Sequence, residues 1–240
     1  MLTIVFDLDG TLIDTAPDLI HTLNVTLGQE GLPQVPYDIA RPLIGGGAKA
    51  MIERALAFEG RACSRAEVEA LYARFVAYYA DHIADRSRPF PDLEATLDEL
   101  AEAGHRLAVC TNKLEWLSKR LLETLQLAQR FAAICGQDTF GVQKPDPEIF
   151  RRTVLRAGGD PVEAVMVGDS ATDIRTARAA KVPVVAVDFG YTDVPIKTLA
   201  PDRLISSFAQ LPAALGDLGL GENLVGRNMA GNQGFIRHKD

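Results

Sequence analysis

The sequence lacks an excess of basic residues and a long apolar run. Its formal net charge is −7, so it offers no basic surface for nucleic acid. No apolar run approaches the roughly 18–20 residues that span a bilayer, and we expect no membrane partner. We also expect no cleaved signal peptide, because cleavage would remove the segment that carries Asp7 and Asp9.

Cysteine is scarce as well. Cys63, Cys110 and Cys135 form no CxxC pair and are odd in number. The last two lie in apolar, strand-like runs, which predicts buried thiols in a reducing compartment. We therefore expect a cytoplasmic protein, and its 240 residues suffice for one large domain or two small ones.

The first motif is the stretch FDLDGTLIDT at residues 6–15, which follows an apolar run at residues 2–6. That run predicts a strand buried on both faces. Asp7 and Asp9, two positions apart at its end, should point the same way. Their carboxylates would repel each other unless a cation lies between them. Gly10 then permits a sharp turn and leaves room for a ligand.

Helical patterns alone follow this strand up to about residue 86. Thr15 with Asp18, and Ser64 with Glu67, have the spacing of capping boxes. Residues 36–59 continue as helix around the glycines at 45–47, and a long amphipathic helix follows Ser64.

Helix and strand alternate from residue 88 onward, which predicts a doubly wound parallel α/β sheet, a Rossmann-like core. The expected strands are 106–111, 132–136, 163–168, 183–187 and 203–205, and the expected helices are 92–103, 115–126, 147–157 and 171–180. The domain organisation is thus a core of residues 1–14 and 88–216, an inserted helical cap of residues 15–87, and a flexible glycine-rich tail at 217–240.

Three further strand ends carry polar residues suited to a phosphate and a metal. They are Thr111-Asn112 after strand 106–111, Lys144 before helix 147–157, and Asp169-Ser170 after strand 163–168, with Asp173 three residues beyond Ser170. Ser170 and Asp173 also fit a capping box. The carboxyl ends of parallel strands are where such sheets bind ligands.

In this order, the four motifs resemble those of the haloacid dehalogenase superfamily, in its subgroup with a helical cap after the first strand. The resemblance covers residues 1 to about 215. Within the subgroup, IGGGAKAMIERAL in the cap and the later GYTDVPIKTLAPDRLISSF are most similar to bacterial phosphoglycolate phosphatases. The resemblance implies a Mg²⁺-dependent phosphomonoester hydrolase, with 2-phosphoglycolate as the expected small-molecule substrate.

The resemblance also implies roles for individual residues. Asp7 would be the nucleophile and Asp9 the general acid and base. Mg²⁺ would be held by Asp7, the backbone carbonyl of Asp9, and Asp169. The phosphoryl oxygens would be held by Thr111, the backbone of Asn112, and Lys144. Asp173 and Ser170 would lie at the edge of the metal site without binding the metal.

The cap supplies a candidate site for the substrate's carboxylate. Gly45, Gly46 and Gly47 can form a nest of backbone N–H groups at the start of a helix, flanked by Arg41 and Lys49. A flexible turn with solvated basic residues is the alternative. Lys49, and Asp92 in place of a usual glycine, depart from the family pattern.

Other functions stay open at this point. A phosphatase for another small phosphomonoester, such as a sugar phosphate, a nucleotide or pyrophosphate, fits the same motifs. A phosphoglucomutase would need a proton-transfer residue in the cap, for which Lys49 is the candidate. Asp9 argues against a dehalogenase and against a signalling receiver, because neither needs a leaving-group acid. The chain could be a monomer or a homodimer.

Overall fold

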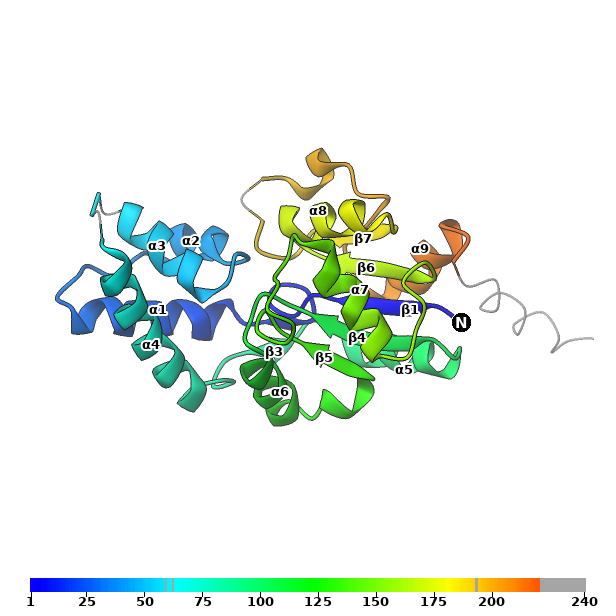
Figure 1. The fold of residues 1–240 in the computed structure, drawn as a ribbon, viewed down its shortest axis with the longest axis horizontal. Coiled ribbons are helices and arrows are strands. Elements are labelled where there is room, and N and C mark those ends of the chain that lie inside the picture. Colours follow the sequence, from blue (N-terminus) through cyan, green and yellow to red (C-terminus); the bar gives the residue numbers. More distant parts are fainter. Residues whose placement is uncertain (59, 62, 193, 221–240) are drawn as a thin grey trace, which may run out of the picture.

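The computed structural model describes residues 1–220 except 59, 62 and 193. A six-stranded parallel sheet in the order β5-β4-β1-β6-β7-β8 forms the core, with β1 near its centre (Figure 1). The strands are β1 (Thr3–Phe6), β4 (Arg106–Cys110), β5 (Ala133–Cys135), β6 (Ala164–Gly168), β7 (Val184–Val187) and β8 (Arg203–Ile205). The predicted doubly wound sheet is therefore confirmed.

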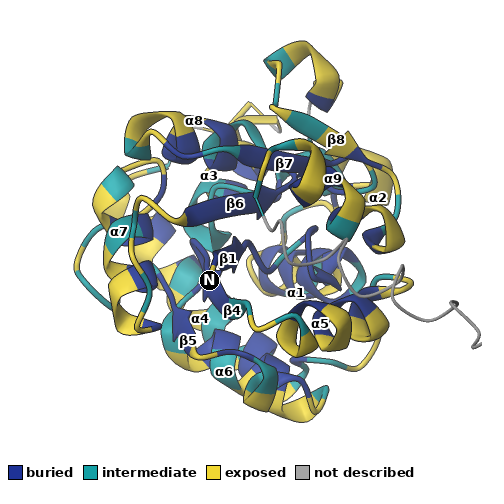
Figure 2. Ribbon diagram, turned by 90° about the vertical axis from the view of Figure 1, so that its right-hand side faces the viewer, coloured by how far each residue is buried: buried dark blue, intermediate teal, exposed yellow. Residues whose placement is uncertain are grey.

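Helices cover both faces of this sheet. They are α5 (Leu93–Glu102), α6 (Glu115–Thr124), α7 (Pro147–Arg156), α8 (Ala171–Ala180) and α9 (Leu211–Asp217). Side chains of a strand alternate between faces, so Phe6 packs with α5 and α6, whereas Val5 packs with α7 and α8. Strands β1, β4, β5, β6 and β7 are buried except for Arg106 at the start of β4, whereas the edge strand β8 is buried only at Ile205 (Figure 2). Burial on both faces explains the near-continuous apolar sequence of the central strands.

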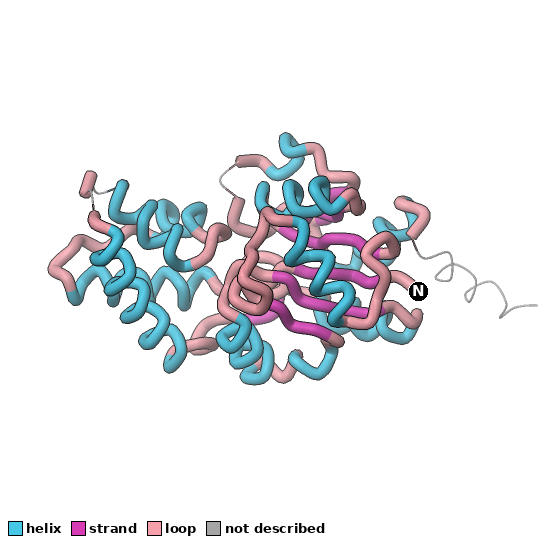
Figure 3. The backbone as a smooth tube through the Cα atoms, viewed as in Figure 1, coloured by secondary structure: helices cyan, strands magenta, loops and turns pink. Residues whose placement is uncertain are grey.

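The segment 15–87, which we call the cap, is helical and lies beyond the carboxyl ends of the strands (Figure 3). Its helices are α1 (Ala16–Gln29), α2 (Tyr37–Ala40), α3 (Ala48–Phe58) and α4 (Arg65–Asp81), with a 3₁₀ turn at Arg41–Leu43. Two short antiparallel strands, β2 (Ile13–Asp14) and β3 (Arg88–Pro89), pair where the chain leaves the core and returns to it.

The start of α1 differs from the sequence prediction. Thr15 makes no side-chain capping bond, and its buried hydroxyl has no partner among the described residues. Asp18 instead accepts hydrogen bonds from the N–H groups of Arg86 and Ser87 and from the Ser87 hydroxyl. The predicted capping box is wrong here because Asp18 binds the returning chain. The Ser64–Glu67 and Ser170–Asp173 capping boxes are confirmed.

Asp92, the departure from the expected glycine, has a left-handed backbone with φ of 63°. Glycine favours that conformation, and aspartate tolerates it better than most residues. The Asp92 carboxylate also accepts a hydrogen bond of 2.8 Å from the Ser207 hydroxyl, a contact that a glycine could not make. The predicted tail at 217–240 lies outside the described residues from 221 onward.

Candidate active site

The site is built at the carboxyl ends of β4, β1 and β6, which are neighbours in the sheet. Asp7 follows β1, Thr111 follows β4 and Asp169 follows β6. Parallel pairing in matching register brings these three ends to one edge, so residues more than a hundred positions apart meet there.

Three buried carboxylates form the centre of the site. Asp7, Asp169 and Asp173 each offer an oxygen within 4.8 Å of the others. The Lys144 ammonium lies 2.9 Å from Asp7 Oδ1 and 2.6 Å from Asp173 Oδ1. Ser170 donates its hydroxyl to the second oxygen of Asp173 at 2.6 Å. Asp173 is fully buried and pairs directly with the Lys144 ammonium, whereas Asp7 and Asp169 keep 6% and 3% of their surface exposed and the donors to Asp169 are neutral. Asp7 and Asp169 are therefore the better candidates for metal ligands.

The charge balance of this cluster favours a bound cation. Burial raises the pKa of Asp7 to about 7. The Lys144 charge opposes this shift, whereas repulsion from Asp173 and Asp169 adds to it. Burial and the Asp173 charge likewise raise the pKa of Asp169 to about 6. One lysine does not neutralise three carboxylates, and a hard dication with oxygen ligands fits the donor set. The described residues can therefore hold a metal ion.

Asp169 is oriented by two donors from separate loops. The Thr11 hydroxyl donates to Oδ1 at 2.9 Å, and the Tyr191 backbone N–H donates to Oδ2 at 2.7 Å. Gly190 allows that loop to approach, since a Cβ there would lie only 2.2 Å from the Asp169 Cβ. Gly168 has the same role beside Asp173, where a Cβ would lie 2.4 Å from Cγ. Such bonds to a ligand's other oxygens fix its orientation.

Asn112 anchors the loop that carries Lys144. Its side-chain carbonyl accepts the Lys144 N–H at 2.9 Å, and its amide donates to the Lys144 carbonyl at 3.1 Å. The Thr111 hydroxyl is also buried and accepts the Lys113 N–H at 3.2 Å. Its own proton can still be donated to a ligand.

Asp9 has a different partner from Asp7. The Lys113 ammonium lies 2.9 and 3.2 Å from the two Asp9 oxygens and donates to the Tyr79 hydroxyl at 2.9 Å. Tyr79 belongs to α4, so this contact joins the cap to the core. Burial raises the pKa of the Tyr79 hydroxyl, so Tyr79 stays neutral.

A cavity opens between the cap and these strand ends. The cap contributes mainly apolar side chains together with Gly45 and Gly47. The core contributes Asp7, Asp9, Thr111, Asn112, Lys113 and Gln137, with Leu114 and Leu117 at the margin toward α6. Among the described lining residues Lys113 is the single basic one. The cavity thus has a polar, charged floor and an apolar roof.

The other predicted cap residues lie elsewhere. Gly46 faces a neighbouring groove. Arg41 donates to the Phe189 carbonyl at 3.0 Å, and its guanidinium lies 5.0 Å from the centre of the Tyr191 ring. The Lys49 ammonium pairs with Glu69, half exposed to solvent. Neither basic side chain lines the cavity, because each is held by another partner.

The comparisons with known proteins agree with this arrangement. Residues 4–187 match the family model described as haloacid dehalogenase-like hydrolase. The chain belongs to this family. It is 49% identical to the phosphoglycolate phosphatase of Agrobacterium fabrum, with 88% of this chain and 91% of the relative covered. It is also 49% identical to the phosphoglycolate phosphatase of Mesorhizobium japonicum, over 89% and 94% of the two chains.

Among solved structures, this haloacid dehalogenase-like hydrolase is similar to a predicted phosphoglycolate phosphatase from Haemophilus somnus. The TM-score is 0.81 at 29% identity, over 89% of this chain and 97% of the other. The resemblance to the superfamily and to its phosphoglycolate phosphatases, which the motifs indicated, is therefore confirmed.

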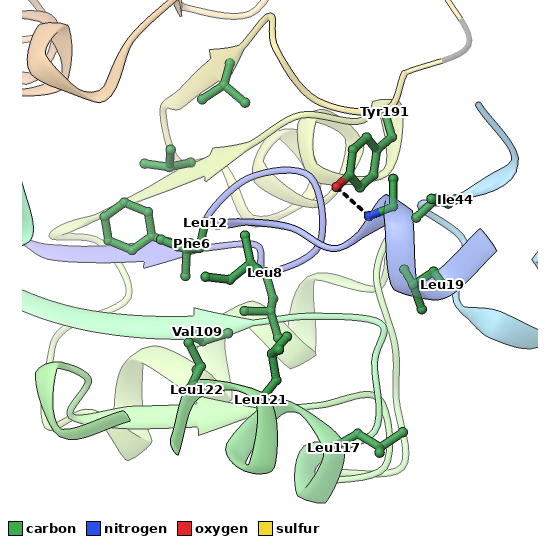
Figure 4. Close-up of a cluster of buried hydrophobic side chains, with 14 of the residues drawn as sticks. Phe6, Leu8, Leu12, Leu19, Ile44, Val109, Leu117, Leu121, Leu122 and Tyr191 are labelled. Carbon is green, nitrogen blue, oxygen red and sulfur yellow. Dashed lines mark hydrogen bonds between the residues drawn. The ribbon is translucent and has the colours of Figure 1, made fainter. Parts of the chain in front are cut away.

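Sequence reasoning missed three residues of the hydrolase site. Lys113 directly follows the Thr111-Asn112 motif, and this adjacency was the available signal. Thr11 lies within the first motif, where its spacing from Asp9 suggested no role. Tyr191 lies in the family-like segment that begins at Gly190, but nothing local indicated that its hydroxyl contacts Asp14 and accepts the Ala16 N–H across the fold. Figure 4 shows the second of these bonds.

Proposed function

We propose that this protein is a phosphatase that hydrolyses 2-phosphoglycolate through an aspartyl-phosphate intermediate. The proposal rests on one observation: two carboxylates line the same cavity, and each is paired with a different lysine ammonium. Asp7 contacts Lys144, deep among the strand ends, and Asp9 contacts Lys113, toward the cap. Two carboxylates in distinct settings suit two distinct roles, a nucleophile and an acid–base group.

In the first step, an Asp7 oxygen attacks phosphorus, and the bond from phosphorus to the leaving oxygen breaks. Asp9 gives its proton to that oxygen, so glycolate leaves with a neutral hydroxyl group rather than as an alkoxide. In the second step, Asp9 takes a proton from water, and the water oxygen attacks phosphorus. The bond between phosphorus and Asp7 then breaks, which releases phosphate and restores both carboxyl groups.

The phosphoryl group would be held by the Thr111 hydroxyl, the Asn112 backbone and the Lys144 ammonium. Lys144 is almost fully buried, and a charge in such a place interacts strongly with the developing negative charge. The side chain of Asn112 is committed to the Lys144 backbone, which is consistent with a backbone role for Asn112 and with a firmly placed lysine.

Mg²⁺ is the proposed cofactor, held by Asp7, Asp169 and the backbone carbonyl of Asp9. When bound, it would polarise the phosphoryl oxygens and reduce the repulsion between them and the carboxylates. Asp173 would orient Lys144, which it contacts at 2.6 Å, and Ser170 would orient Asp173. These assignments give each buried carboxylate of the cluster a function.

The cap would cover the cavity during the reaction. Its apolar side chains, including Phe75 and Met51, line the roof, where they exclude bulk water from the intermediate. The mutase alternative loses its support, because Lys49 pairs with Glu69 outside the cavity.

We also propose a cytoplasmic location. No helix among the described residues is long and apolar enough to cross a membrane. Cys110 and Cys135 are partners on neighbouring strands and remain free thiols, and burial raises the pKa of Cys110 to about 12. Free thiols are usual in reducing compartments.

The test is a substrate panel with the purified full chain and Mg²⁺. We expect the highest kcat/KM for 2-phosphoglycolate among this substrate, a sugar phosphate, a nucleotide and pyrophosphate. Acid quenching should trap phosphate on the parent protein and none on Asp7→Asn. Turnover that favours a neutral sugar phosphate would overturn the substrate assignment, whereas a phosphorylated protein without turnover would indicate a receiver.

A further inference from the structure

We propose that Lys113 is the residue that binds the carboxylate of the substrate. This inference rests on the proposed function and assigns the specificity to the core rather than to the cap glycines or to Arg41 and Lys49. In the structure Lys113 is held at the cavity by Asp9 and Tyr79, which keep its ammonium in place for the incoming anion.

The geometry around Lys113 leaves little freedom. Its side chain is only 6% exposed, and its ammonium lies 4.4 Å from the centre of the Tyr79 ring, in addition to its bonds to Asp9 and the Tyr79 hydroxyl. An ammonium has three protons to donate. The phenol hydroxyl is the weakest of its acceptors, so a carboxylate can replace it and form a charge-assisted bond.

The distribution of charge in the cavity points to the same residue. The substrate brings a phosphate and a carboxylate to a cavity whose floor already contains Asp7 and Asp9. Lys144 lies against Asp7 and is suited to the phosphate end. Lys113 is the single basic side chain among the described lining residues, so it is the available partner for the second anion.

The position of Asp9 fixes where the carboxylate must lie. As the proposed acid, Asp9 contacts the leaving oxygen, and in 2-phosphoglycolate a single methylene joins that oxygen to the carboxylate. A cation 2.9 Å from Asp9 is therefore next to the carboxylate of a substrate bound for reaction. A longer or neutral leaving group would not place an anion there.

A purely positioning role is the competing explanation. If Lys113 only orients Asp9, its loss slows every substrate to a similar extent and acts mainly on kcat. If it binds the carboxylate, its loss acts on KM as well, and only for substrates that carry a carboxylate. The two explanations differ in the ratio between substrates.

The experiment compares 2-phosphoglycolate with 2-hydroxyethyl phosphate, in which a hydroxymethyl group replaces the carboxylate. For Lys113→Met we expect the preference for 2-phosphoglycolate, measured as the ratio of the two kcat/KM values, to fall by about 10–100-fold. Lys113→Arg, which keeps the charge, should retain part of the preference. This variant also provides a test if Lys113→Met does not fold.

Lys49→Met is the matched control. Lys49 is also an ammonium beside a carboxylate and a tyrosine ring, namely Glu69 and Tyr72, yet it lies outside the cavity. We expect its substrate ratio to equal that of the parent. If kcat/KM of Lys113→Met fell equally for both substrates, so that the ratio stayed unchanged, the role of Lys113 in binding the carboxylate would be overturned and the proposed function would still stand. A parent protein without preference for 2-phosphoglycolate would overturn the proposed substrate together with it.

Discussion

Buried carboxylates are costly unless each has a partner, and the individual aspartates of this site are partnered in different ways. Asp173 is bound on both oxygens by Lys144 and Ser170, and Asp169 by Thr11 and the Tyr191 backbone. Asp7 Oδ1 contacts the Lys144 ammonium and also accepts the Leu8 N–H. The other Asp7 oxygen is the one available to attack phosphorus.

Substitution of Asp7 and Asp9 separates the two roles. Asp7→Asn should abolish turnover, because the amide is a poor nucleophile and no covalent phosphate can form. Asp9→Asn should slow turnover of 2-phosphoglycolate by about 10²–10⁴-fold, as is typical for loss of a general acid–base group. Steady-state kinetics and acid-quench labelling measure both effects.

A substrate with a good leaving group provides the control. p-Nitrophenolate needs little protonation to leave, so the Asp9→Asn protein should still be labelled by p-nitrophenyl phosphate and should then hydrolyse the intermediate slowly. Near-normal rates in Asp7→Asn would place the nucleophile on another residue.

At the scale of secondary structure, elements defined by local patterns were predictable and contacts across the fold were not. The periodicity of residues 88–205 predicted all five strands that join β1 in the sheet, because each follows from a short apolar run. The Ser170–Asp173 capping box was predictable because it too is formed within a few neighbouring residues. The Thr15–Asp18 cap failed because Asp18 found a partner 69 residues away, Ser87. The contact of Lys113 with Tyr79 of α4 was likewise unpredictable, because the two residues are 34 positions apart.

Asp18, near the start of α1, holds the last residues of the cap, Arg86 and Ser87, against its first helix. It is 3% exposed and accepts bonds of 2.8 and 2.6 Å from the N–H and hydroxyl of Ser87. Asp18→Ala would leave these donors buried without a partner, and we expect a loss of about 2–4 kcal/mol in the free energy of unfolding. Urea unfolding measures it.

Asp38→Ala is the matched control, since Asp38 is an exposed aspartate in the first turn of α2. We expect its free energy of unfolding to lie within about 0.5 kcal/mol of the parent value. Equal effects of the two substitutions would mean that Asp18 has no special part in holding the two ends of the cap together.

On the scale of the whole molecule, the cap and core are tied together by the residues that surround the reaction site. The Tyr191 hydroxyl accepts the Ala16 N–H at 2.9 Å, at the start of the cap, while its backbone N–H holds Asp169. Gly47 lies so close to the core that a Cβ would be 3.1 Å from the Asn112 carbonyl oxygen. Occupancy of the site should therefore affect the stability of both parts.

Metal binding offers the test of that coupling. A ligand that binds only the folded state at about 100 times its Kd adds about 2.7 kcal/mol of stability. For a chain of this size that corresponds to a rise in Tm of roughly 5–10 °C. We expect this rise when Mg²⁺ is added to the chelator-treated parent protein, and none with NaCl at equal ionic strength.

Asp169→Asn should remove the effect without unfolding the protein. An asparagine can accept the Tyr191 N–H and donate to the Thr11 oxygen, so both partners of Asp169 remain bonded. The substitution also removes one of the repelling buried charges, so its Tm without metal should equal or exceed that of the parent. The same Mg²⁺-dependent rise in Asp169→Asn as in the parent would place the metal elsewhere. A flat response in the parent would contradict the proposed metal site itself, because three buried carboxylates around one lysine would then be tolerated without a cation.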